Sequence, residues 1–265
     1  MSRRTTAYEV ALTGPLAARA LDIDGFRDGE WPFMGCVAHA ARPRPGIIRT
    51  RQFAAQEVGE TQIAAPSLVL RHLGDDVGLL AAAARRDGVT ADDRIELALE
   101  CMLHRGLVTV EELAFRGGSF EGDKALRRVL ARRPNEPPTE SYAETRFWQF
   151  LRRNGFDAWR QVPILDLTGR QVHRVDFVIV FFPQVRRRPR PRILSPTDGL
   201  LAEVDSQAFH LDAFERDHNR QSIYDALGYR SLMITPNQVE RRQAMVLAAI
   251  NGAMASGRPS VRRSA

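Results

Sequence analysis

The chain has 265 residues, enough for one large domain or two ordinary ones, and its hydrophobic fraction of 44% and charged fraction of 26% are typical of a globular protein. Lys and Arg outnumber Asp and Glu by 38 to 32, a net charge of +6, which favours polyanionic partners such as DNA. The two cysteines form no CxxC pair, which excludes a cysteine-rich zinc module. The sequence has no signal peptide and no apolar run of roughly 20 residues, so we expect a cytoplasmic protein without a membrane partner.

Residues 1–133 are predicted to form a smaller, mainly helical (α+β) domain. Short apolar runs such as 46–48 suggest small strands, and the pattern becomes helical from Pro66 to about Leu80. Thr90 is a plausible N-cap for a helix that ends near Gly106, and further helices are expected at 109–113 and 123–133. The turn at 106–108 fits a helix-turn-helix element and fits a small helical bundle equally well.

The segment 134–138, with the sequence Pro-Asn-Glu-Pro-Pro, predicts a linker, because proline removes a backbone donor and disfavours helix in the residue before it. A second domain is expected over 139–255, followed by a basic tail over 256–265. Its predicted elements, in order, are a helix from Thr139 or Ser141 to about Arg153, strands at 161–165, 172–182 and 200–204, a helix at 211–227, a strand at 229–235 and a helix from Pro236 to about Ala255. This order predicts an α/β layout with helices on the faces of a central sheet.

Three carboxylates stand where this layout would bring them together. Asp176 lies inside a strongly apolar strand, and Glu203 and Asp205 lie two residues apart at the end of the next strand, so that their side chains face the same side. A charge inside an apolar strand is costly unless it is paired, hydrated or bound to a metal. Hard oxygen ligands of this kind suit Mg²⁺, with Mn²⁺ possible, and Mg²⁺ in turn suits phosphodiester cleavage. Glu144, on the helix after the linker, is a candidate fourth carboxylate.

Each acid also has an ordinary structural interpretation. Glu144 has the periodicity of an exposed helix residue, Asp176 could be a cap or pair with Arg174 or Arg216, and Glu203 and Asp205 could be a solvated strand end. For all of these structural interpretations to be true at once, several acids on adjacent strands would each need a separate explanation. A shared metal site explains them together.

Basic and titratable groups surround these acids in the sequence. His210, five residues after Asp205, is a candidate proton-transfer group or a surface histidine, and His173 and His218 are weaker candidates. Candidate DNA-phosphate contacts are Arg174, the helical pair Arg216 and Arg220, and the loop residues Arg186, Arg187, Arg188, Arg190 and Arg192. The alternatives are surface ion pairs for the helical arginines and a basic loop with no fixed partner.

At these residues the chain resembles the very-short-patch repair (Vsr-like) endonucleases of the PD-(D/E)xK superfamily, and more closely the proteins that carry a related domain of unknown function. The matching pieces, in order over about 139–250, are 143–147 (AETRF), 174–177 (RVDF), 203–205 (EVD), 209–210 (FH), 215–220 (ERDHNR) and 228–230 (GYR). The resemblance implies a restriction-endonuclease-like fold and a Mg²⁺ site with Asp176 as principal ligand, Glu203 as strand acid, Glu144 as helix acid and His210 in proton transfer. Asp205 stands where many members have Lys, although Asp is usual in this subgroup, and Ser206 replaces a usual Gly.

In the N-terminal half, 43–46 (PRPG) and 64–70 (AAPSLVL) resemble the later part of abortive-infection antitoxin-like regulators, whose winged helix is missing or worn down here. We therefore expect a metal-dependent DNA endonuclease. Two alternatives stay open: a non-catalytic DNA-binding or antitoxin-like regulator on a nuclease fold, and an interaction subunit of a phage-defence or mobile-element complex that docks a protein partner through residues 1–133.

Overall fold

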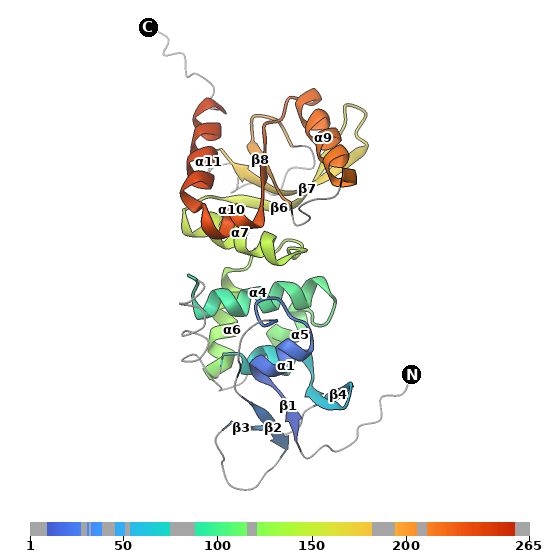
Figure 1. The fold of residues 1–265 in the computed structure, drawn as a ribbon, viewed down its shortest axis with the longest axis vertical. Helices are drawn as coiled ribbons and strands as arrows, with labels where there is room; N and C mark the ends of the chain where they lie inside the picture. The colour runs from blue at the N-terminus through green and yellow to red at the C-terminus, as the bar shows by residue number, and fades with distance from the viewer. Residues whose placement is uncertain are drawn as a thin grey trace. The chain divides into compact units, whose positions relative to one another are not determined.

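The structure is a computed structural model that describes residues 10–27, 31, 33–38, 46–50, 54–74, 88–115, 121–181, 194–205 and 211–257. The chain separates into two compact units, residues 1–134 and residues 135–265, which are of similar length (Figure 1). Among the helices so described, none is both long enough and apolar enough to cross a bilayer.

The N-terminal unit contains a five-stranded mixed sheet in the order β3-β2-β1-β5-β4. Its strands are β1 (Ala11–Leu12), β2 (Gly35–Ala38), β3 (Ile47–Thr50), β4 (Ala55–Val58) and β5 (Thr61–Ala64). β1 is antiparallel to β2 and parallel to β5, whereas β3 is parallel to β2 and β4 antiparallel to β5. This is more β-structure than the sequence pattern indicated, because strands of two to four residues carry no readable alternation.

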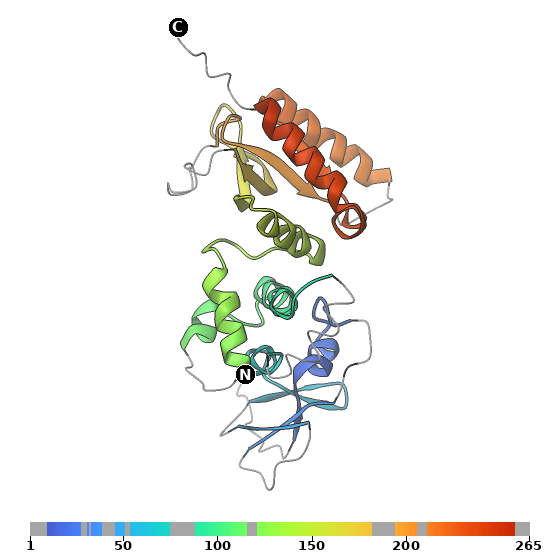
Figure 2. The same cartoon turned by 90° about the vertical axis from the view of Figure 1, so that its left-hand side faces the viewer.

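Helices gather on one side of this sheet (Figures 1 and 2). They are α1 (Gly14–Ala20), α2 (Pro66–His72), α4 (Ala91–His104), α5 (Val110–Phe115) and α6 (Glu121–Arg132). Thr90 caps α4 as expected, in a capping box with Asp93. The helix expected from Pro66 is present as α2, which ends at His72 and is followed by a turn at 73–74; the expected helix from residue 75 onwards lies outside the described residues. A single apolar core joins the sheet to α1, α2, α4 and α6.

The C-terminal unit is a four-stranded mixed sheet, in the order β6-β7-β8-β9, with helices on both faces. Its elements are α7 (Tyr142–Arg153), β6 (Ala158–Leu165), β7 (Gln171–Val180), β8 (Gly199–Val204), α9 (Leu211–Ala226), β9 (Ser231–Ile234), α10 (Pro236–Arg241) and α11 (Gln243–Gly257). β6, β7 and β8 run antiparallel to one another, and β9 runs parallel to β8. The α/β layout expected from the sequence is confirmed at this level, with the last expected helix divided at Arg242.

Two apolar clusters hold the helices on the sheet. Phe147 of α7 and Ile250 of α11 pack with Phe177 on one face, and Tyr224 of α9 packs with Val178 on the other. Figure 1 shows α11 and α9 on opposite sides of β8. Because both faces of the sheet are covered there, β8 is buried along its whole length and β7 is largely buried from Val175 to Val180.

Strands β6 and β7 change their buried face at one row of the sheet. Trp159 and Val162 belong to the same apolar cluster, as do Val175 and Val178, although strand residues three apart normally face opposite sides. On β6 the change falls at Gln161, whose φ of 51° lies in the left-handed region. The pairs on either side of this row place Gln161 opposite Asp176. The sheet is therefore irregular at the row that holds the candidate site.

Candidate functional site

Asp176 and Glu203 lie side by side where the ladder between β7 and β8 ends. Its last pair is Phe177 with Ala202, and continuing that register sets Asp176 opposite Glu203. In place of main-chain pairing, the Val204 N–H donates to Asp176 Oδ2 at 2.8 Å and the Asp176 N–H lies 3.4 Å from Glu203 Oε2. Glu203 is 2% exposed. The interpretation of Glu203 as part of a solvated strand end is therefore wrong, and the two acids predicted to meet do so.

The two carboxyl groups differ in their protonation. Burial, followed by the negative charges of Glu203 and Glu144, raises the pKa of Asp176 to about 8. Burial also raises the pKa of Glu203, but hydrogen bonds from His173 and Tyr224 and the positive charge of Arg220 outweigh it and leave that pKa below its ordinary value. At neutral pH, without a bound cation, Glu203 carries the charge and Asp176 keeps its proton.

Glu203 is held by two donors on the same oxygen. His173 Nε2 lies 2.9 Å from Oε1, and the Tyr224 hydroxyl donates to Oε1 from α9. Tyr224 is fully buried, and its pKa is well above the usual range because of burial and then the charge of Glu203, so its hydroxyl stays a donor. The sequence marked His173 only weakly and did not mark Tyr224, because a tyrosine at helical spacing is an ordinary core residue.

Glu144 is fixed at the start of α7 by a capping arrangement. Ser141 is the N-cap; its hydroxyl donates to Glu144 Oε1 at 3.0 Å, while the Glu140 N–H donates to Oε2 at 2.9 Å. Gln161 Nε2 also donates to Oε2, at 2.9 Å. Glu144 is 6% exposed, so its interpretation as an ordinary exposed helix residue is wrong. Gln161 was not predicted, since its role depends on a backbone conformation that the sequence does not reveal.

The remaining candidates are placed unequally. Asp205 follows β8, is half-buried, and donates its N–H to Ile234 at 2.9 Å. Arg174 forms an ion pair with Glu140 at 2.5 Å, so the pairing considered between Arg174 and Asp176 is not the one observed. Arg220 on α9 is close enough to stabilise the charge of Glu203. Six candidates lie outside the described residues: His210, Arg186, Arg187, Arg188, Arg190 and Arg192. The structure describes the main chain of Arg216 and His218 but not their side chains.

The donor set fits Mg²⁺ as a site of two carboxylates. Across the residues that the structure describes, no group of three or more His, Cys, Asp or Glu side chains is placed to hold a metal ion. Mg²⁺, however, keeps several of its waters and is held by one or two carboxylates together with substrate phosphates. Asp176 and Glu203 supply such oxygens, and a cation beside them would relieve the like-charge repulsion that raises the pKa of Asp176. Glu144 already accepts hydrogen bonds on both oxygens and would have to exchange one to become a ligand.

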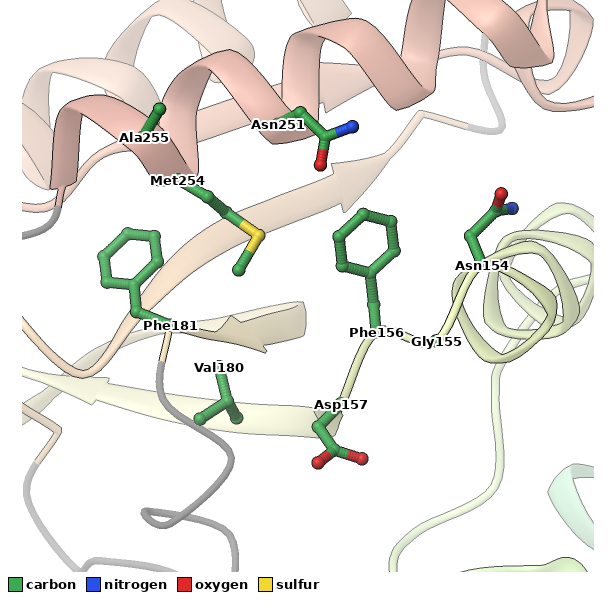
Figure 3. Close-up of a pocket in the computed structure, with 9 residues that line it drawn as sticks. All are labelled: Asn154, Gly155, Phe156, Asp157, Val180, Phe181, Asn251, Met254 and Ala255. Carbon is green, nitrogen blue, oxygen red and sulfur yellow. The ribbon is translucent and has the colours of Figure 1, made fainter.

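A separate hollow of about 550 Å³ opens beyond the last residue of β7 (Figure 3). Phe156, Phe181 and Met254 form much of its wall, and Asp157 and Asn251 lie at its rim. None of the candidate acids lines this hollow, so we do not assign the candidate site to it despite its volume.

Comparisons of the chain with protein-family models, with curated proteins and with solved structures give no significant match. The fold and the site define a mixed α/β unit in which the buried Glu203 lies against the half-buried Asp176. Its function is therefore argued from this geometry and from chemistry.

Proposed function

We propose that the C-terminal unit is a Mg²⁺-dependent endonuclease, able to use Mn²⁺, that hydrolyses phosphodiester bonds in DNA. The observation that carries this proposal is the meeting of Asp176 and Glu203, which are 27 positions apart in the sequence, inside an apolar sheet. A buried carboxyl group, Glu203, in contact with a half-buried one, Asp176, destabilises a fold unless another interaction compensates. Binding of a divalent cation by the two carboxylates would compensate for this destabilisation.

The architecture supports the same proposal. A helix, three antiparallel strands, a second helix and a parallel strand follow one another in this unit. A mixed sheet flanked by helices is what the resemblance to Vsr-like, restriction-endonuclease-like domains implies. The acids fall on α7, β7 and β8, the elements that the resemblance assigns to Glu144, Asp176 and Glu203.

Each residue has a distinct role in the proposed reaction. Asp176 and Glu203 would hold the Mg²⁺ ion, which when bound supplies charge neutralisation at the phosphate and lowers the pKa of bound water. Glu144, held by Gln161, adds negative charge next to Asp176. Arg220 lies beside Glu203 and is a candidate contact for the scissile phosphate. Proton transfer by His210 and salt-sensitive DNA contact through Arg174 and the arginines of 186–192 stay predictions.

The test is nicking of supercoiled plasmid with Mg²⁺, with Mn²⁺ and with EDTA. Asp176→Asn removes the charge and keeps the shape of the neutral carboxyl group, so the variant should fold. Its matched control is Asp166→Asn, at the turn between β6 and β7, where Asp166 Oδ1 accepts three hydrogen bonds that an amide oxygen can also accept. We expect metal-dependent nicking by wild type and by Asp166→Asn. The nicking rate of Asp176→Asn should be lower by at least about 100-fold. Mutation of residues that only position a metal ligand already lowers metal affinity or activity by about 10- to 100-fold.

Two results would decide against this mechanism. Nicking retained by Asp176→Asn would refute the assignment of the site. DNA binding that survives both EDTA and Asp176→Asn, without nicking by any variant, would favour a non-catalytic DNA-binding regulator on the same fold.

A further inference from the structure

Each carboxylate of the Asp176–Glu203 pair has one oxygen that is held by short hydrogen bonds from protein donors. On Glu203 this is Oε1, which accepts from the Tyr224 hydroxyl and lies 2.9 Å from His173 Nε2. On Asp176 it is Oδ2, which accepts from the Val204 N–H at 2.8 Å. Glu203 Oε2 accepts a longer hydrogen bond, from the Asp176 N–H at 3.4 Å. The two carboxyl side chains also hydrogen-bond to each other, so a cation that displaces the Asp176 proton would meet one oxygen from each carboxylate.

The two donors to Glu203 come from different elements and hold it from two directions. His173 stands on β7, three residues before Asp176, and Tyr224 stands on α9. Their rings lie 5.7 Å apart between centroids. Tyr224 is surrounded by the apolar cluster of Val162, Val178 and Leu201, so rotation of Glu203 would leave its hydroxyl without this acceptor in an apolar environment. The orientation of the Glu203 carboxylate is therefore fixed by the fold.

We propose that His173 and Tyr224 are positioning residues that restrict Glu203 to a single metal-facing oxygen, and that this restriction makes the site selective for Mg²⁺ and Mn²⁺ over Ca²⁺. This inference rests on the proposed function. Ca²⁺ takes six to eight oxygen ligands and readily accepts a bidentate carboxylate, whereas Mg²⁺ requires an octahedron in which it keeps several waters. A site that offers one oxygen from each of two carboxylates suits the smaller ion.

The test measures metal binding by the full-length chain, without DNA. Binding of Mn²⁺ is followed by the loss of the electron paramagnetic resonance signal of the free ion, and Mg²⁺ and Ca²⁺ are measured by competition. Wild type should release Mn²⁺ to Mg²⁺ at lower concentrations than to Ca²⁺. Tyr224→Phe and His173→Ala should each lower Mn²⁺ affinity by about 10- to 100-fold. Both should also shift the ratio of Ca²⁺ to Mg²⁺ affinity towards Ca²⁺, because Oε1 becomes available.

Two further variants separate positioning from simple structural support. His173→Gln keeps an N–H donor and should recover most of the wild-type ion preference. Tyr229→Phe is the matched control, because the buried Tyr229 hydroxyl donates to the Leu194 carbonyl and not to an acid. It should lower stability as Tyr224→Phe does and leave metal binding unchanged.

The outcomes are distinguishable. Folded Tyr224→Phe and His173→Ala proteins with the wild-type ratio of Ca²⁺ to Mg²⁺ affinity would overturn the positioning role while leaving the proposed function intact. Wild type that binds no Mn²⁺ would instead remove the metal centre on which the proposed function rests. If Tyr224→Phe does not fold, His173→Ala decides the matter, since the His173 side chain is 25% exposed and His173 is not a member of the apolar clusters.

Discussion

Asp176 keeps its proton at a pH where an ordinary aspartic acid has lost it. Burial and the neighbouring charges of Glu203 and Glu144 raise its pKa from 3.8 to about 8. In the unfolded chain the group ionises near its ordinary pKa. Between these two values the folded state binds more protons than the unfolded state, so stability falls as pH rises through this window.

We therefore expect the C-terminal unit, in EDTA, to lose stability between about pH 4 and pH 8. Asp176→Asn, which resembles the neutral carboxyl group, should remove most of this loss and be the more stable protein at pH 8 by about 1–3 kcal/mol, the order of the desolvation cost of a buried polar group. Urea unfolding at pH 5 and pH 8 measures it. If the stability of Asp176→Asn depends on pH as that of wild type does, a group other than Asp176 binds the proton that causes this dependence. Added Mg²⁺ should stabilise wild type more than the variant at pH 8, because a cation replaces the proton.

The sequence located part of this site and not the rest, for physical reasons. Asp176 and Glu203 could be predicted because charge inside an apolar strand is costly and therefore conspicuous. Gln161 and Tyr224 could not, since a glutamine with positive φ and a core tyrosine look like any others in a sequence. Glu144 was visible as a residue near a helix start, but its burial depends on the tertiary contact with Gln161.

Among the elements, β7 and β8 were predictable and the N-terminal strands were not. Apart from the acid that each carries, both strands are apolar over 175–180 and 199–204, and their ends lie within two residues of the predicted limits. β1, β2, β4 and β5 have at most four residues each and gain their stability from pairing, which depends on register and not on local pattern. The seven-residue helix α1 has no side-chain cap and was missed for a similar reason.

Helix α4 is joined to α6, and to the residue directly after α6, by ion pairs that differ in burial. Arg133 Nε lies 2.9 Å from Glu100 Oε1, with 8% and 1% of the two side chains exposed. Arg128 Nη2 lies at the same distance from Asp92 Oδ1, with 57% and 21% exposed. Water screens the second pair, whereas removal of Arg133 takes a cation away from a buried carboxylate.

Arg133→Met should therefore destabilise the N-terminal unit by roughly 3–5 kcal/mol. The matched change Arg128→Met, four residues before the end of α6, should cost less than about 1 kcal/mol. Urea unfolding of the two variants and of wild type, followed by far-ultraviolet circular dichroism, gives the comparison. Equal losses in the free energy of unfolding would mean that burial of the Arg133–Glu100 pair does not determine its contribution to stability. Raising the salt concentration should reduce the loss caused by Arg128→Met and leave that caused by Arg133→Met unchanged.

At the scale of the whole molecule, each unit has its own apolar core. The residues of the N-terminal core lie between Ala11 and Val129, and those of the two C-terminal clusters between Ala143 and Ile250. The acids proposed to bind metal all lie in the second unit. Within the proline-rich segment, Glu136 belongs to that unit: its Oε2 accepts from the Arg160 N–H at 3.1 Å and lies 3.6 Å from Arg160 Nε.

The fragment 135–265 should therefore fold alone and bind Mn²⁺ within a few-fold of the affinity of the full chain. A fragment that begins at Thr139 lacks Glu136, removes one anionic partner from the fully buried Arg160, and should be less stable by about 1–3 kcal/mol. Thermal unfolding by circular dichroism and Mn²⁺ binding by paramagnetic resonance measure both. If fragment 135–265 folds but binds Mn²⁺ far more weakly than the full chain, residues 1–134 contribute to the site. If the two fragments are equally stable, the contact between Glu136 and Arg160 adds nothing, and the second unit begins after the prolines.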